Sequence, residues 1–122
     1  MNIEKIESSN DAGRILLVED SEDQRDAMLS LLVARSYRAD GAATVADALR
    51  LLHAHTYDAV VSDYNLPDGS VDSLAAHVSS AELIVITGSL LVVDGGLPFP
   101  VFTKPLNIPR FFDCLRKTLS RA

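Results

Sequence analysis

The sequence predicts an α/β fold in which helices cover both faces of a parallel β-sheet. Short apolar runs alternate along the chain with segments in which apolar residues recur at helical spacing. The apolar runs are continuous, which is typical of strands that are buried on both faces. A helical segment separates most consecutive strands, and parallel strands need crossover connections of this kind.

Size and composition fit one globular domain. The 122 residues are 48% hydrophobic, enough to bury a core without disulfides or structural metals. The net charge of -6 disfavours nonspecific binding to nucleic acid or anionic membranes, because both need a basic face. The single cysteine, Cys114, excludes an intramolecular disulfide and suits a reducing cytosol. Residues 1–13 form a polar lead unlike a signal peptide or membrane anchor, and we expect residues 14–122 to form a cytoplasmic domain.

The first strand and the first helix follow the polar lead. Residues 15–18 form an apolar run too short for a helix, and the strand that they predict ends at Glu19 and Asp20. Ser21 and Gln24 have the spacing of a capping box, which predicts a helix beginning after Ser21. The apolar face of this helix contains Ala27, Met28, Leu31 and Leu32.

Two further strands enclose a second helix. Residues 37–42 predict a strand weakly, and Thr44 with Asp47 then opens a helix. The third strand, residues 57–63, ends at Asp63 and leads into the turn sequence "YNLPDGS". The apolar residues of the second helix recur at helical spacing: Val45, Ala48, Leu49 and Leu52.

The second half of the chain contains two more strands and two more helices. Ser70 can cap a helix with apolar residues at i, i+3, i+4 and i+7 (Val71, Leu74, Ala75, Val78). Residues 82–87 and 100–103 predict strands that end at Thr87 and run into Lys104. Asn107 caps the last helix, whose core face contains Ile108, Phe111, Phe112, Leu115 and Leu119.

Polar side chains follow four of the predicted strands: Glu19 and Asp20, Asp63, Thr87, and Lys104. In open parallel sheets, ligands bind at the carboxyl ends of the strands. Carboxylates brought together there repel one another unless a cation is present. An all-oxygen site with few protein ligands favours Mg²⁺ together with a phosphoryl group.

The same residues suggest a reaction. An aspartate such as Asp63 can act as a nucleophile and form an acyl phosphate, while Thr87 and Lys104 stabilise the phosphoryl oxygens. Taken singly, each residue has an ordinary explanation as a helix cap, a surface charge or a turn residue. Their occurrence together at the ends of four strands favours the chemical interpretation.

These motifs resemble the receiver domain of bacterial two-component response regulators. Over residues 14–119, "ILLVEDS" is similar to the acidic-pair strand of that family, "VVSDYNLPDGS" to its phosphoacceptor strand, "LIVITGS" to its threonine strand and "VFTKPL" to its lysine-proline strand. The resemblance implies a doubly wound five-stranded parallel sheet with the flavodoxin-like order 2-1-3-4-5.

The resemblance also implies a site and partners. A histidine kinase or a histidine phosphotransfer protein would phosphorylate Asp63, and Thr87 and Lys104 would hold the phosphoryl group. The metal would be Mg²⁺, with Asp20, Asp63 and the backbone carbonyl of Asn65 as ligands and Glu19 acting through water.

The sequence departs from the family pattern in two places. The family usually has an aromatic residue three positions before the lysine, where this chain has Val101, and Phe102 should face the opposite side of the sheet. Between the fourth and fifth strands, Gly95, Gly96, Pro98 and Pro100 disfavour a helix. We therefore expect helix 4 of the family to be shortened or replaced by a loop.

Two alternatives remain open on the sequence. One is a phosphorylation-independent interaction module with the same fold, which the two departures favour. The other is a Mg²⁺-dependent phosphohydrolase, which would carry a second acid where this chain has Asn65. We therefore expect no enzymatic activity beyond self-phosphorylation and self-dephosphorylation. From the negative net charge we expect no direct contact with nucleic acid or membrane. We interpret His53, His55 and His77 as surface residues, and Cys114 as a small buried hydrophobic residue.

Overall fold

The computed structural model of this protein describes residues 13–78, 82–88 and 99–120. Its main sheet has five parallel strands in the order β2-β1-β3-β6-β7, which is the predicted order 2-1-3-4-5. The doubly wound fold class is therefore confirmed. The strands are β1 (Arg14–Val18), β2 (Arg38–Ala42), β3 (Ala59–Asp63), β6 (Leu83–Thr87) and β7 (Val101–Thr103).

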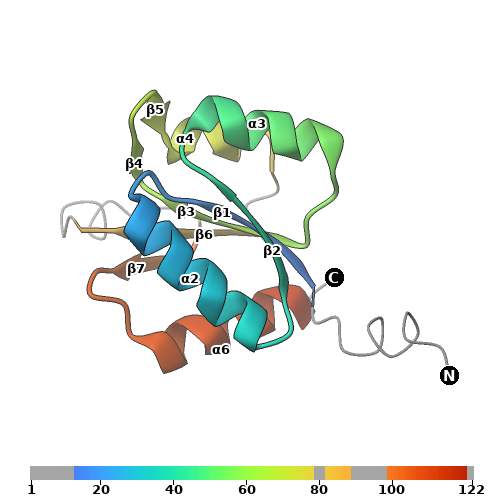
Figure 1. The fold of residues 1–122 in the computed structure, drawn as a ribbon, viewed down its shortest axis with the longest axis vertical. Coiled ribbons are helices and arrows are strands. Elements are labelled where there is room, and N and C mark those ends of the chain that lie inside the picture. Colours follow the sequence, from blue (N-terminus) through green and yellow to red (C-terminus); the bar gives the residue numbers. More distant parts are fainter. Residues whose placement is uncertain (1–12, 79–81, 89–98, 121–122) are drawn as a thin grey trace, which may run out of the picture.

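Helices cover both faces of the sheet (Figure 1). On one face lie α2 (Glu22–Ala34) and α6 (Ile108–Ser120), and on the other lie α3 (Val45–Ala54) and α4 (Val71–Ala75). Alternate residues of each central strand therefore enter different cores: Ile15 and Leu17 pack beneath α2 and α6, whereas Leu16 and Val18 pack beneath α3 and α4.

The predicted helix caps are present at every described helix. The side-chain oxygens of Ser21, Thr44, Ser70 and Asn107 each accept a backbone N–H bond from the first turn that follows. The reciprocal half of the predicted capping box is different, because the amide of Ser21 donates to Glu19 Oε2. The Gln24 side chain instead bonds to Lys104, at the edge of the sheet.

Two details of the predicted helices are wrong. Ala27 was expected on the apolar face of the first helix, but it is exposed, because only the face with Met28, Leu31 and Leu32 turns toward the sheet. The third helix was expected to continue to Val78 but ends at Ala75. Val78 still packs against the core from the turn that follows.

A short hairpin that the sequence did not predict connects β3 to α4. Its strands, β4 (Asn65–Leu66) and β5 (Gly69–Ser70), are antiparallel, with Pro67 and Asp68 at the tip. Residues 65 and 66 point in opposite directions: Leu66 is buried in the core beneath α3 and α4, and Asn65 is exposed. Sequence patterning misses such a hairpin because two-residue strands have no measurable periodicity.

The predicted departure at the fifth strand is confirmed. Val101 packs against the core beneath α3 and α4, while the ring of Phe102 lies on the opposite face, 5.8 Å from the ring of Phe111. The expected shortening of helix 4 concerns residues 89–98, which lie outside the described residues, as do residues 1–12 of the polar lead. Within the described residues, no helix is long and apolar enough to span a membrane.

Candidate functional site

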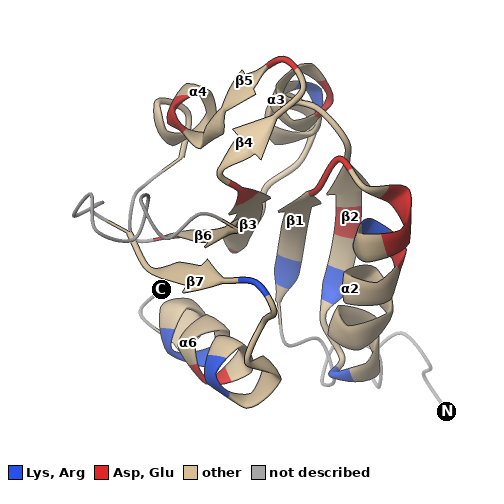
Figure 2. Cartoon of the chain, turned by 90° about the vertical axis from the view of Figure 1, so that its left-hand side faces the viewer, with Lys and Arg blue, Asp and Glu red and all other residues tan. Residues whose placement is uncertain are grey.

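Three carboxylates meet at the carboxyl edge of the sheet. Because β1 and β3 are neighbours, Glu19 and Asp20 after β1 lie beside Asp63 at the end of β3, and one oxygen from each lies within 4.8 Å of the others. Figure 2 shows acidic residues at these strand ends and a basic residue just after β7. Glu19 and Asp63 are buried, with 6% and 8% of their surface exposed, whereas Asp20 is exposed.

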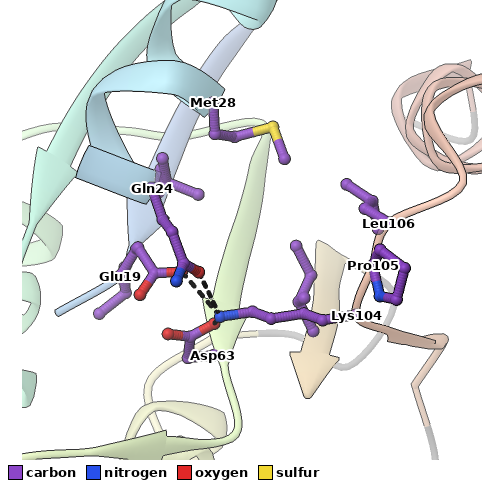
Figure 3. A pocket seen from close by; sticks show the side chains of 10 residues that line it. Glu19, Gln24, Met28, Asp63, Lys104, Pro105 and Leu106 are labelled. Atoms are coloured by element: carbon purple, nitrogen blue, oxygen red, sulfur yellow. Dashed lines mark hydrogen bonds and ion pairs between the residues drawn. The ribbon is translucent and has the colours of Figure 1, made fainter. Parts of the chain in front are cut away.

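Lys104 reaches into this cluster from the end of β7. Its backbone amide donates to Thr87 O at 2.9 Å, which holds the end of β7 against β6. Its ammonium nitrogen lies 3.1 Å from Glu19 Oε1 and 3.2 Å from Asp63 Oδ1 (Figure 3). Lys104 is therefore in direct contact with two of the three predicted acids, Glu19 and Asp63.

Gln24 belongs to the same network, although sequence reasoning assigned it only a capping role. Its Oε1 accepts a hydrogen bond of 2.7 Å from Lys104 Nζ (Figure 3). The helix α2 begins just after the acidic pair, and Gln24 lies in its first turn. This position could have indicated from the sequence that Gln24 lies near the site. Gln24 thus couples the start of α2 to the lysine.

Two cavities adjoin Lys104. The smaller, about 210 Å³, brings the other predicted residues to Asp63, since its lining includes Asp20, Asp63, Asn65, Thr87 and Lys104. The larger, about 500 Å³, has Glu19, Gln24, Asp63 and Lys104 at its polar end (Figure 3). Its remaining wall is mostly apolar: Leu17, Val18, Met28, Ile86, Pro105 and Leu106. The smaller cavity has the size and polarity for a phosphoryl group and a metal ion.

The buried acids have opposite pKa shifts. Burial, together with the hydrogen bond and the charge of Glu19, raises the pKa of Asp63 to about 7, although Lys104 opposes this. Burial also acts to raise the pKa of Glu19, but hydrogen bonds from Asp63, the Ser21 amide and Lys104 outweigh it and lower that pKa. Ionisation of Asp63 is therefore disfavoured by its surroundings, whereas ionisation of Glu19 is favoured.

The donor set suits a hard divalent cation. All candidate side-chain ligands are carboxylate oxygens. Burial and the neighbouring Glu19 raise the pKa of Asp63 although Lys104 lies beside it, so ionisation of both acids calls for further positive charge. A divalent cation would supply the rest. Among the described residues, this cluster is the one group of three or more potential metal ligands.

The histidines lie apart from this cluster. All three are exposed, as expected. The rings of His53 and His77 approach to 6.1 Å, and the ring of His55 lies 6.2 Å from that of Tyr57. Cys114 lies on α6 at the edge of the core and is half-buried, whereas the sequence predicted a buried residue.

Comparison with known proteins identifies the family. The family sequence model described as response regulator receiver domain matches residues 15–89. This range includes the acidic pair, Asp63 and Thr87. The chain belongs to the response regulator receiver family. Among curated proteins, no significant match is found.

Solved receiver domains have the same fold. The HemR receiver domain from Leptospira biflexa is 28% identical, with a TM-score of 0.72 over 88% of this chain and 94% of that one. The receiver domain of the hybrid histidine kinase CckA is 26% identical, also with a TM-score of 0.72, over 88% of this chain and 99% of that one. TrrA from Thermotoga maritima, solved in complex with Mg²⁺ and BeF, is 23% identical, with a TM-score of 0.76 over 87% of this chain and 98% of that one, and this likeness concerns the fold alone.

Proposed function

We propose that this receiver domain accepts a phosphoryl group on Asp63 from a phosphohistidine donor in the cytoplasm. The donor would be a histidine kinase or a histidine phosphotransfer protein, and the signal would be altered partner binding or onward phosphoryl transfer. One observation carries the proposal: a buried aspartate at a strand end, next to two further acids and 3.2 Å from a lysine ammonium.

Each residue of the site has a role in this reaction. An Asp63 carboxylate oxygen attacks phosphorus, the bond between phosphorus and the donor imidazole nitrogen breaks, and the imidazole leaves with the bonding electron pair and takes up a proton. Lys104 neutralises negative charge on the phosphoryl oxygens, and the Thr87 hydroxyl donates a hydrogen bond to one of them. Gln24 holds the Lys104 side chain at the site.

The fit of the acids to a divalent cation supports a role for Mg²⁺. Asp20, Asp63 and the backbone carbonyl of Asn65 would hold the ion, with Glu19 acting through water. When bound, Mg²⁺ supplies positive charge that favours the ionised form of Asp63 and neutralises a phosphoryl oxygen. The exposed carboxylate of Asp20 leaves one side of the cluster open to solvent.

We also propose that the domain is not an enzyme for separate substrates. Its chemistry would be limited to the formation and loss of its own acyl phosphate. Asn65 supports this, because it lines the smaller cavity at a position where a phosphohydrolase would need a second acid for proton transfer.

The test is phosphorylation by a small acyl-phosphate donor. The protein is incubated with Mg²⁺ and acetyl phosphate, and its intact mass is measured. We expect one phosphoryl adduct that requires Mg²⁺ and is absent from Asp63→Asn. No adduct, or an adduct that survives this substitution, would instead support a phosphorylation-independent interaction module. Sustained phosphate release from unrelated phosphomonoesters would indicate a hydrolase.

A further inference from the structure

The tip of the hairpin between β3 and α4 is bonded to the start of α3. The carboxylate of Asp68 accepts hydrogen bonds from the amide of Val45 at 2.8 Å and from that of Ala46 at 3.0 Å. Thr44 Oγ1 accepts the next amide, that of Asp47, at 3.1 Å. The first turn of α3 is therefore capped partly by its own N-cap residue and partly by an acid more than 20 residues along the chain.

Side-chain packing joins the hairpin to the same region. Gly69 has a φ of +158°, and a Cβ atom there would lie 3.5 Å from Val45 Cγ2 and 3.3 Å from Ser73 Oγ. Leu66 is buried in the core that also contains Val45 and Val71. The hairpin thus lies beside the first turns of both α3 and α4 (Figures 1 and 2).

This contact bears on the phosphorylation site through Asn65. On β4, Leu66 enters the core while Asn65 lines the smaller cavity beside Asp20 and Asp63. The ladder of the hairpin is only two residue pairs long, Asn65 with Ser70 and Leu66 with Gly69. Such a short ladder gives little rigidity by itself. Backbone hydrogen bonds join Tyr64 to Ile86 and Val71 and hold the base of the hairpin, whereas the bonds made by Asp68 hold its tip.

We propose that Asp68 is a positioning residue for the metal site, acting through the hairpin that presents the backbone carbonyl of Asn65. This inference rests on the proposed function, which makes that carbonyl a Mg²⁺ ligand. Mg²⁺ demands nearly octahedral geometry and short bonds to oxygen, so a small displacement of one ligand weakens binding. Loss of an outer partner of a ligand typically weakens metal binding tenfold or more.

The experiment compares three single variants of the full chain. Asp68→Ala removes both bonds from the hairpin to α3. Thr44→Ala removes the neighbouring cap of the same helix without touching the hairpin. Asp72→Asn removes an exposed negative charge from the first turn of α4, while its amide oxygen can still accept the bond from the Ser70 hydroxyl. It controls for long-range attraction of the cation. Mg²⁺ dissociation constants are measured from the amide chemical shifts of Asp63 and Asn65, and folding is checked by circular dichroism.

We expect Asp68→Ala to raise the Mg²⁺ dissociation constant about fivefold, less than the tenfold or more that follows loss of a direct partner of a metal ligand. The two controls should change it by less than about twofold. Asp68→Asn retains one acceptor oxygen, so its effect should be intermediate, and it provides the test if Asp68→Ala does not fold. Equal weakening in Asp68→Ala and Thr44→Ala would show a general effect of α3 stability and would overturn the proposal. A dissociation constant unchanged in both Asp68 variants would also overturn it.

Phosphorylation kinetics separate this inference from the proposed function. With acetyl phosphate, high Mg²⁺ concentrations should restore the adduct formation rate of Asp68→Ala to that of the wild type, because only metal affinity has changed. A rate that stays low at saturating Mg²⁺ would contradict the positioning role. If the wild type forms no adduct, the proposed function fails; if the wild type reacts but Asp68→Ala behaves like Thr44→Ala, only the role of Asp68 fails.

Discussion

Because the pKa of Asp63 is raised, we predict that the free energy of unfolding falls as the pH rises toward 7. Substitution of Asp63 should abolish this pH dependence. The folded protein holds the Asp63 proton up to a pKa of about 7, whereas the carboxyl group has an ordinary pKa of 3.8. Across the interval between these values the native state binds more protons than the unfolded state. The free energy of unfolding contributed by Asp63 is therefore greatest at low pH and is lost as the pH rises through 7.

The size of this loss follows from the pKa values. Integrating the difference in bound protons from about pH 5 to about pH 7 gives a decrease of about 2 kcal/mol in the free energy of unfolding. Glu19 has the opposite sign, because its lowered pKa adds stability that disappears as the pH falls. That change occurs below the ordinary pKa of 4.5 of Glu19, outside the chosen interval.

The assay is urea unfolding of the wild type and Asp63→Asn at several pH values between about 5 and 8, with EDTA to exclude metal. The substitution removes the titrating group but preserves its shape. Between about pH 5 and pH 7, we expect the wild type to lose about 2 kcal/mol relative to Asp63→Asn. Parallel stability curves would refute the raised pKa and the electrostatic argument based on it.

Three further predictions concern other parts of the molecule. Lys104→Met should tighten Mg²⁺ binding several-fold, because the ammonium near Glu19 and Asp63 repels the incoming cation; a Mg²⁺ titration measures this. Tyr57→Phe should lower the free energy of unfolding by about 1 kcal/mol, because the Tyr57 hydroxyl donates a 2.6 Å hydrogen bond to Asp40 Oδ2. Phe111→Ala should lower the free energy of unfolding by about 3 to 5 kcal/mol, because the ring of Phe111 is fully buried between α6 and the sheet. Urea unfolding measures both.

Each of these predictions has a control or a contradicting result. Lys117→Met removes a lysine that pairs with Asp113 on α6 and should leave Mg²⁺ affinity unchanged. Weaker Mg²⁺ binding in Lys104→Met would show that the lysine stabilises the metal site. An unchanged free energy of unfolding in Tyr57→Phe would mean that water replaces the hydroxyl at Asp40. If Phe111→Ala lowers the free energy of unfolding by less than about 1 kcal/mol, the ring is not tightly packed between α6 and the sheet.

Local sequence information determined most of the fold. The strands β1, β3 and β6 are continuous apolar runs buried on both faces, a pattern that requires no knowledge of neighbours. The caps at Ser21, Thr44, Ser70 and Asn107 are equally local, since each involves an amide no more than three residues away. Parallel strands place their carboxyl ends at one edge of the sheet, so the order of strands and helices along the chain is enough to assign the residues that follow them to one site.

Only the tertiary structure decided which groups of that site touch. Ser21 and Gln24 have the spacing of a capping box. In the structure, however, the Gln24 side chain accepts a hydrogen bond from Lys104, which lies 80 residues away in sequence. Asp68 has the sequence context of a simple turn, yet its carboxylate caps the first turn of α3. The pKa of Asp63 depends on its burial and on the distances to Glu19 and Lys104. The sequence by itself determined which functional groups are present at the edge of the sheet. Long-range packing decided their geometry, because hydrogen bonds and charge interactions depend on distances between residues that are far apart in the sequence, and local sequence patterns do not specify these distances.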